Sequence, residues 1–269
     1  AIFVFSVILR CLPMFYYPYF PVGDSHLHLS LVRLISSKGS VYTSWEPYYH
    51  GDVCYPLGFH VCVSSLWKAI GHGVLGLLKV IPLFTAVVSG ISVLVIFSIE
   101  RELTGSLKSS LIAALLYGFA LSSDDIHVYE MGCLPNVLGN LMVLSLIYSM
   151  VEYALSREWI YLVFGGIFAS AIIHVHYLST MMVVFSLMAI LAFTILIRRR
   201  ALRRHLLFIA VSGLVGGILS ARWLYWITPR VLLRIGEIVG KCVERVEKPK
   251  TFSDLIDTVV TDKYVGIPI

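Results

Sequence analysis

The sequence predicts an all-α polytopic membrane protein, with about seven transmembrane helices and two interfacial helices in the first external loop. Hydrophobic residues make up 58% of the chain and charged residues only 14%, and the mean hydropathy is +0.85. Soluble domains contain roughly half apolar and a quarter charged residues. In addition, long apolar runs recur along the chain, and basic residues gather in alternate connections between them.

The chain begins at Ala1 rather than Met, already inside an apolar run. We therefore expect a fragment in which residues 1–13 are the remnant of a first spanning helix, because about 20 apolar residues are needed to cross a bilayer. Prolines and aromatic residues then end this helix. Residues 1–228 are expected to form a transmembrane module with an external loop at 14–76. Residues 229–269 are expected to be an external amphipathic segment that begins a further C-terminal part.

The external loop contains two short helical patterns. From Ser25 to Ser36, leucine and isoleucine recur at helical spacing while polar residues occupy the other positions. From Phe59 to Ile70, a second apolar segment of about 12 residues is too short to span. Both segments are therefore predicted to lie flat at the membrane interface.

Six longer apolar runs follow and are predicted to span the membrane. Two of them, near residue 174, must be separate helices, since a single helix would be nearly twice as long as the ~30 Å hydrocarbon thickness. The predicted spans are roughly Leu77 to Ile99, Leu107 to Ser122, Asn136 to Leu155, Trp159 to Ile173, Thr180 to Ile197 and Leu206 to Ile227.

The distribution of basic residues predicts the orientation. If the arginine-rich run at 198–204 is cytoplasmic, alternation of the spans puts the connections at Arg157 and Arg101 on the same side. Residues 123–135 and 174–179 then lie outside, and neither connection contains a Lys or Arg. The first loop is also external, provided that the second short helix does not cross.

Neither the cysteine spacing nor the net charge indicates a zinc site or nucleic-acid binding. The five cysteines form no C-x-x-C pair and no zinc-finger spacing, so they are interpreted as small apolar packing residues. The formal charge of +5 is concentrated in the run at 198–204, which is typical of a cytoplasmic stop after a membrane helix. The charge therefore gives no indication of nucleic-acid binding.

Acidic and histidine side chains collect on the predicted outer face. They are Asp24, His26, His28, Glu46, His50, Asp52 and His60 in the first loop, Asp124, Asp125, His127 and Glu130 in the second, and His174 with His176 in the third. On a helix that begins near Asp24, His28 is the i+4 neighbour, so the carboxylate can orient or charge the imidazole. The alternative role for Asp24 is that of a helix N-cap.

The first loop resembles a family of membrane enzymes. It contains Gly-Asp-Ser-His-x-His at 23–28, a following amphipathic helix with Arg33 and Gly39, and Tyr-Pro-Leu-Gly-Phe-His at 55–60. This pattern, and the predicted order of one helix, an external loop and six further helices, resembles the amino-terminal module of the GT-C superfamily of membrane glycosyltransferases. That superfamily includes the protein O-mannosyltransferases, the aminoarabinose-lipid A transferases and the catalytic subunit of oligosaccharyltransferase.

The resemblance implies an inverting glycosyltransferase of the cytoplasmic (plasma) membrane with an extracytoplasmic active face. It implies transfer of a sugar from a polyprenyl-phosphate donor to a protein, lipid or glycan acceptor. Asp24 matches the first-loop aspartate that acts on the acceptor, with a role as general base, and His28 is its partner. The second-loop acids of the superfamily correspond to Asp124, Asp125 or Glu130.

Two further sets of side chains are candidates for binding. The leaving phosphate requires cationic contacts, for which Arg222, near the outer end of the last span, is the first candidate and Arg10 and Arg33 are the others. No cofactor is certain. Some superfamily members bind a divalent cation through paired acids, but position 26 is a histidine here. Nitrogen ligands for a divalent metal could come from His26, His174 and His176.

Two other functions compete with the transferase. A transporter would typically contain acids in mid-span, broken helices and internal repeats, and we identify no Asp or Glu in mid-span and no evident repeat. A non-catalytic membrane scaffold that keeps the fold is the second alternative. The sugar, the lipid carrier, the acceptor, the dependence on metal and the oligomeric state are not predicted by the sequence.

Overall fold

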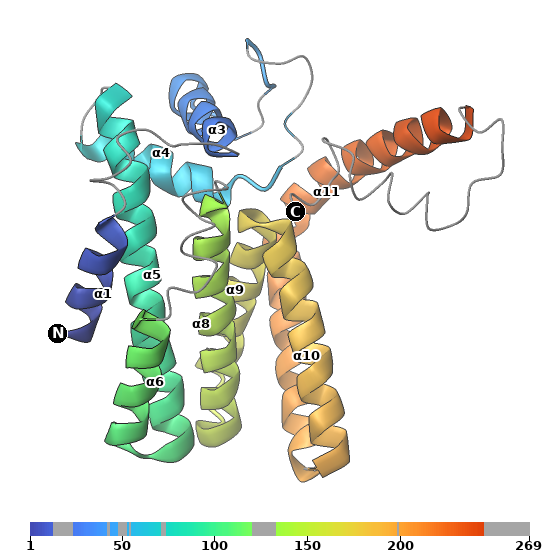
Figure 1. Cartoon of the computed structure of the whole chain (residues 1–269). Coiled ribbons are helices and arrows are strands. Elements are labelled where there is room, and N and C mark those ends of the chain that lie inside the picture. Colours follow the sequence, from blue (N-terminus) through green and yellow to red (C-terminus); the bar gives the residue numbers. More distant parts are fainter. Residues whose placement is uncertain are drawn as a thin grey trace. The chain divides into compact units, whose positions relative to one another are not determined.

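The computed structural model describes residues 1–12, 24–41, 44–47, 53, 55–70, 74–119, 133–197 and 199–244. The secondary-structure elements formed by these residues are all helices, which confirms the all-α prediction. The chain divides into two compact units, Ala1–Ser220 and Ala221–Ile269. The helices in chain order are α1 (Ile2–Cys11), α3 (Ser25–Lys38), α4 (Gly58–Ile70), α5 (Val74–Thr104), α6 (Leu107–Phe119), α8 (Leu134–Ser156), α9 (Ile160–Val175), α10 (Tyr177–Ile197) and α11 (Arg199–Glu244) (Figure 1).

Four helical stretches are long and apolar enough to cross a membrane: Gly76–Thr104, Leu134–Ser156, Tyr177–Leu196 and Leu202–Gly240. Three shorter helices, α1, α6 and α9, are also apolar. The length and composition of the four long stretches indicate a membrane protein. The predicted total of about seven spans stays a prediction.

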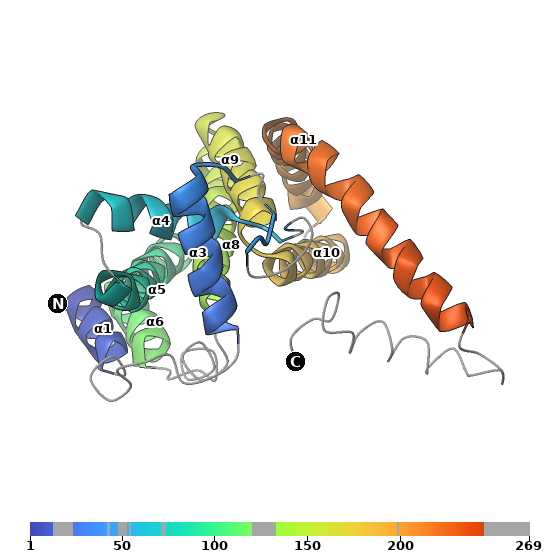
Figure 2. The ribbon, with the colours of Figure 1, turned by 90° about the horizontal axis from the view of Figure 1, so that it is seen from above.

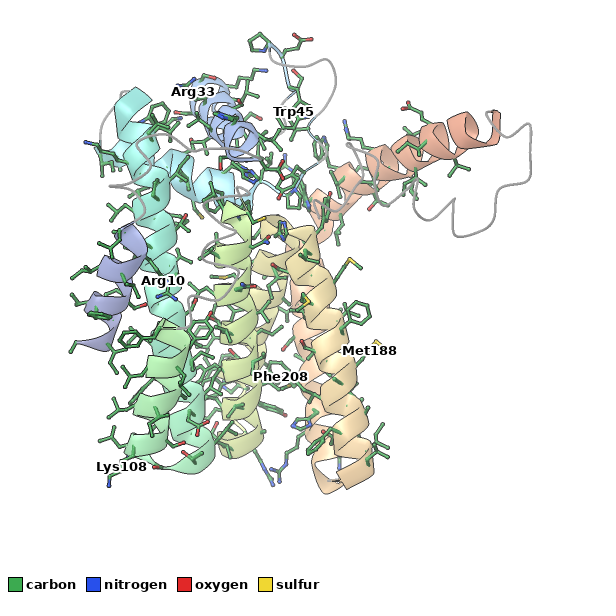
Figure 3. All side chains as sticks on the ribbon, in the orientation of Figure 1. Arg10, Arg33, Trp45, Lys108, Met188 and Phe208 are labelled. Carbon is green, nitrogen blue, oxygen red and sulfur yellow. The ribbon has the colours of Figure 1, made fainter. Side chains whose placement is uncertain are left out.

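Within the first unit the long helices run side by side, and α3 and α4 lie across one end. In Figure 1, the α5–α6 and α8–α9 connections lie at the lower end, whereas the α9–α10 turn lies at the upper end with α3 and α4. Figure 2, seen from above, shows α3 and α4 lying across the bundle, with α5 and α8 seen nearly end-on. In Figure 3, Lys108 is at the lower end, and Arg33 and Trp45 are at the upper end. The α5–α6 and α8–α9 connections thus lie at one end and the α9–α10 turn at the other, and their orientation relative to a membrane stays a prediction.

The short helix α3 follows the sequence prediction closely. It starts at the predicted residue, Ser25, and extends two residues beyond the predicted end at Ser36. Gly39 ends it in the left-handed conformation with φ of 65°, and the Gly39 N–H donates to the Ile35 carbonyl at 2.9 Å. Glycine adopts this conformation without the steric cost that a side chain would add.

Helix α11 differs from the prediction. The sequence predicts a span that ends near Ile227 and a separate amphipathic segment at 229–269, but α11 continues through Pro229. Proline removes one backbone donor and often kinks a helix, but the residues on both sides of Pro229 are helical. The arginine-rich residues from Arg199 are likewise helical.

A buried apolar cluster joins the crossing helices to the bundle. Its fully buried members include Val32 of α3, Phe59 of α4, Ile81 of α5 and Leu134 of α8. Because these side chains come from both crossing helices and from two long helices, apolar burial fixes α3 and α4 against the end of the bundle.

Helices α9 and α11 pack along a seam of small residues. A Cβ atom added at Gly165 would contact Ser212 and Phe208, and one added at Gly166 would contact Val215. Further along the seam, the hydroxyl groups of Ser170 and Ser220 are hydrogen-bonded at 2.9 Å. Small residues allow two helix backbones to approach closely, which is a common basis of helix association in membranes.

Candidate functional site

Two buried histidines join α3 to α4. Nδ1 of His28 and Nε2 of His60 lie 2.9 Å apart, at hydrogen-bonding distance. The side chains are 2% and 0% exposed. His28 lies on the buried face of α3, and His60 is in the first turn of α4. The pair is therefore a directional polar contact inside an otherwise apolar interface.

Tyr55 lies at the centre of this group. It immediately precedes the Pro56-Leu57 step that leads into α4. Its ring contacts four other rings, with centroid distances of 5.8 Å to His28, 5.7 Å to His60, 6.3 Å to His176 and 6.2 Å to Tyr177. Tyr55 thus brings together residues from α3, α4 and the α9–α10 turn. We call Asp24, His28, Tyr55, His60 and His176 the outer cluster.

Asp24 directly precedes α3, but its side chain makes no capping hydrogen bond to the helix. Its backbone carbonyl accepts the first helical hydrogen bond from the His28 N–H, at 2.9 Å. Partial burial raises the pKa of the Asp24 carboxyl above its usual value. The position is thus that of an N-cap, while the carboxylate is not used for capping.

A close backbone contact sets the position of α4. A Cβ atom added at Gly58 would lie 2.8 Å from the His174 carbonyl oxygen and 3.1 Å from a Val175 methyl group. Only glycine allows the start of α4 to approach the end of α9 this closely. The chain turns at His176, the C-cap of α9, which is in an extended conformation. The contact at Gly58 therefore brings the first turn of α4, which contains His60, close to the chain turn at His176.

Burial keeps the imidazoles of His60 and His176 neutral. Burial, followed by the neighbouring rings of His28 and His176, lowers the pKa of His60 well below its usual value. Burial lowers the pKa of His176 to about 4. Burial and then the charge of Asp24 raise the pKa of Tyr55, so its phenol keeps its proton. A carboxylate next to neutral rings and a protonated phenol is suited to accepting a proton.

The stability of the protein should fall as the pH is lowered from about 6.5 towards 4. Above pH 6.5 the rings are neutral in both the folded and unfolded states, whereas at lower pH the unfolded state binds protons that the buried rings of His60 and His176 do not bind. Each such ring costs up to about 1.4 kcal/mol per pH unit. Thermal unfolding in detergent, measured between pH 4 and 8, checks this.

The control for this titration compares two histidines. His176→Gln should weaken the pH dependence, because it removes a buried titratable ring. His26→Gln should leave the pH dependence unchanged, because His26 is exposed. Equal pH dependence in wild type and His176→Gln would contradict the assignment of a neutral buried ring.

The three predicted metal ligands have different surroundings. His26 is exposed on α3, whereas Nδ1 of His174 lies 2.7 Å from the Ser170 carbonyl, and His176 belongs to the outer cluster. Among the described residues, no group of three or more His, Cys, Asp or Glu side chains could hold a metal ion. The side chains in this part of the chain therefore do not fit a metal centre.

The three candidate phosphate ligands have different surroundings. Arg10 is 5% exposed, and its Nη1 donates to the Ser6 hydroxyl and, at 2.8 Å, to the Gly118 carbonyl of α6. Arg33 is partly exposed on α3, at the upper end in Figure 3. Arg222 is exposed on the part of α11 that belongs to the second compact unit. Their roles toward a phosphate stay predictions.

The predicted second-loop acids, Asp124, Asp125 and Glu130, lie outside the described residues. Their assignment to the site therefore stays a prediction.

Sequence reasoning missed the central part of the cluster. Tyr55 and His60 belong to the motif at 55–60, but nothing in the sequence pairs His60 with His28.

A second omission is Glu152, which lies inside a predicted span and is 9% exposed. The phenols of Tyr148 and Tyr161 lie close to its carboxylate. Its position four residues before the end of α8 is closer to the helix end than to mid-span.

No family model, curated protein or solved structure matches this chain.

Proposed function

We propose that this protein is an integral membrane glycosyltransferase that moves a sugar from a polyprenyl-phosphate donor to an acceptor at the extracytoplasmic face. The observation that carries the proposal is the state of Asp24. Its carboxylate directly precedes a helix without capping it, is partly buried, and is close enough to Tyr55 to raise the pKa of that phenol. A carboxylate that does not cap the helix at this position is available as a general base.

The arrangement of the helices supports the orientation of the proposed site. The outer cluster lies at the end of the first unit that carries the α9–α10 turn, opposite the α5–α6 and α8–α9 connections with their basic residues (Figure 1). Basic connections favour the cytoplasmic side. In this proposal α1, α5, α6, α8, α9, α10 and α11 account for about seven spans, α3 and α4 lie at the interface, and the membrane is the plasma membrane.

The proposed reaction is a single displacement. The carboxylate of Asp24 takes the proton from the acceptor hydroxyl or amide as the acceptor atom bonds to the anomeric carbon of the sugar. The bond between that carbon and the phosphate oxygen breaks, and its electron pair leaves with the polyprenyl phosphate. Attack opposite the leaving group inverts the anomeric configuration. Arg33, which belongs to the same unit as Asp24, is the proposed partner of the phosphate, and no step is assigned to a metal.

Transfer of labelled sugar tests this proposal. Membranes from cells that produce the full-length protein should convert radiolabelled polyprenyl-phosphate sugars into a labelled product, and membranes without the protein should not. Label that accumulates inside sealed vesicles without a covalent product would favour the transporter. Absence of both transfer and uptake across a panel of donors would favour the scaffold and contradict the proposed activity.

A further inference from the structure

Helix α11 is longer than a bilayer requires. Its apolar stretch Leu202–Gly240 contains 39 residues, which is about 58 Å at 1.5 Å per residue and so nearly twice the ~30 Å hydrocarbon thickness. Arg203 and Arg204 stand at the beginning of this stretch, and residues 206–221 then carry no charge. The uncharged run is the part suited to the hydrocarbon, so the residues after it need another environment.

Aromatic side chains mark the level at which α11 leaves the hydrocarbon. Trp223, Tyr225 and Trp226 follow directly after the uncharged run and Arg222. Cζ of Arg230 lies 4.4 Å from the centre of the Trp226 ring, and its Nη1 donates to the Trp226 carbonyl at 2.8 Å. Tryptophan and tyrosine favour the headgroup level, where arginine is also common. The residues beyond 226 therefore begin at the membrane surface.

Beyond this level α11 has an exposed apolar stripe. Tyr225, Leu232 and Val239 recur every seven residues, so they lie nearly along one line of the helix. Ile235 lies on the same side, three residues after Leu232 and four before Val239. All four side chains are exposed. We call Tyr225, Leu232, Ile235 and Val239 the C-terminal stripe.

Charged side chains lie on the other side of this part of α11. Arg230 and Glu237 are also seven residues apart, and each precedes a member of the C-terminal stripe by two residues. Two residues turn about 200° around a helix, so the charged line lies nearly opposite the stripe. The part of α11 beyond Pro229 is therefore amphipathic, with an apolar side that is exposed.

We propose that α11 from Pro229 to Gly240 lies along the surface of the bilayer that its preceding part spans, with the C-terminal stripe inserted among the lipid headgroups. The stripe begins at Tyr225, inside the aromatic level, and Leu232 is only about 9 Å further along the helix than Trp226. Amphipathic helices bury such a stripe about 5–10 Å deep at this boundary. Pro229 lacks a backbone donor, which allows the helix to change direction there. The inference is independent of the proposed sugar transfer.

Two quenchers distinguish lipid from water at single positions. A fluorescent amino acid is incorporated at one position of the full-length protein, which is then reconstituted into phosphatidylcholine nanodiscs. Brominated phosphatidylcholine quenches a probe inside the bilayer, whereas iodide quenches a probe in water. Probes at Leu232 and Val239 should be quenched by brominated lipid. Probes at Leu233 and Glu237, which lie off the stripe, should be quenched by iodide.

Three other results would overturn the proposal. Quenching by iodide at all four positions would place this part of α11 in water. Quenching by brominated lipid at all four would place it inside the hydrocarbon. Protection of positions 232 and 239 from both quenchers would mean that protein covers the stripe, as in an association of two copies of the chain.

A pair of matched substitutions tests the stripe itself. Leu232 and Leu233 are neighbours of the same type, 62% and 69% exposed, and they lie on different sides of α11. Loss of one buried leucine lowers a binding equilibrium roughly 10- to 100-fold. Leu232→Asn should therefore raise the iodide quenching of a probe at Val239 towards that at Glu237, whereas Leu233→Asn should not. Equal quenching in the two variants, once size-exclusion chromatography has established that both are folded, would contradict the stripe.

Discussion

Replacing Asp24 by Asn should lower kcat for sugar transfer on the order of 10²- to 10⁴-fold, the range that a positioned general base contributes. The substitution keeps the size of the side chain but removes its ability to take a proton. It should not unfold the protein, because the Asp24 side chain makes no capping hydrogen bond to α3. KM for the donor should change little, since the carboxylate is proposed to act on the acceptor. Initial rates at saturating donor, across pH, measure the effect.

The matched control is Glu46→Gln. Glu46 is an exposed acid in the same loop, and the change from acid to amide is the same. It should retain wild-type kcat. If Asp24→Asn and Glu46→Gln both transferred sugar at the wild-type rate, Asp24 would not be the base.

Replacing Gly166 by Ala should destabilise the first unit by about 1–3 kcal/mol, the usual cost of overpacking. The added methyl group would contact Cβ of Val215 at 2.5 Å and the Ser212 carbonyl at 3.3 Å. Cβ is attached directly to the backbone, so α9 and α11 would have to move apart. Reversible unfolding in detergent by a denaturant titration gives the change in the free energy of unfolding.

Gly213→Ala is the control for this substitution. Gly213 is also on α11, but a Cβ atom added there meets nothing within 4 Å. Alanine is favoured over glycine in helices by up to about 1 kcal/mol, so this variant should be as stable as wild type or more stable. Equal destabilisation by the two substitutions would show that the seam is not closely packed.

Much of the helical layout was predictable because hydrophobic length and periodicity are local properties. The start of α3 at Ser25, the short α4 and the turn near His176 all follow from the spacing of apolar residues, proline and glycine. The continuity of α11 through Pro229 was not predictable in the same way. A proline signals a break because it removes one backbone hydrogen bond, but a helix can continue when the residues on both sides stay helical, as they do in α11.

The candidate site was predictable only where it is local. Asp24 and His28 are one turn apart at the start of a single helix, so their proximity follows from helical geometry. The contact between His28 and His60 joins residues 32 positions apart and depends on how α3 packs on α4. The central position of Tyr55 likewise depends on the α9–α10 turn. Such contacts follow from tertiary packing, which sequence spacing does not encode.

The most direct test of the proposed activity measures both products in one reaction. Purified full-length protein should be supplied with labelled polyprenyl-phosphate sugar and acceptor, and the glycosylated acceptor and the free polyprenyl phosphate should be quantified together. Sugar transfer by a single displacement predicts equal amounts of the two, formed with inverted anomeric configuration and dependent on Asp24. Release of polyprenyl phosphate without glycosylated acceptor, or a product with retained configuration, would contradict the proposed reaction.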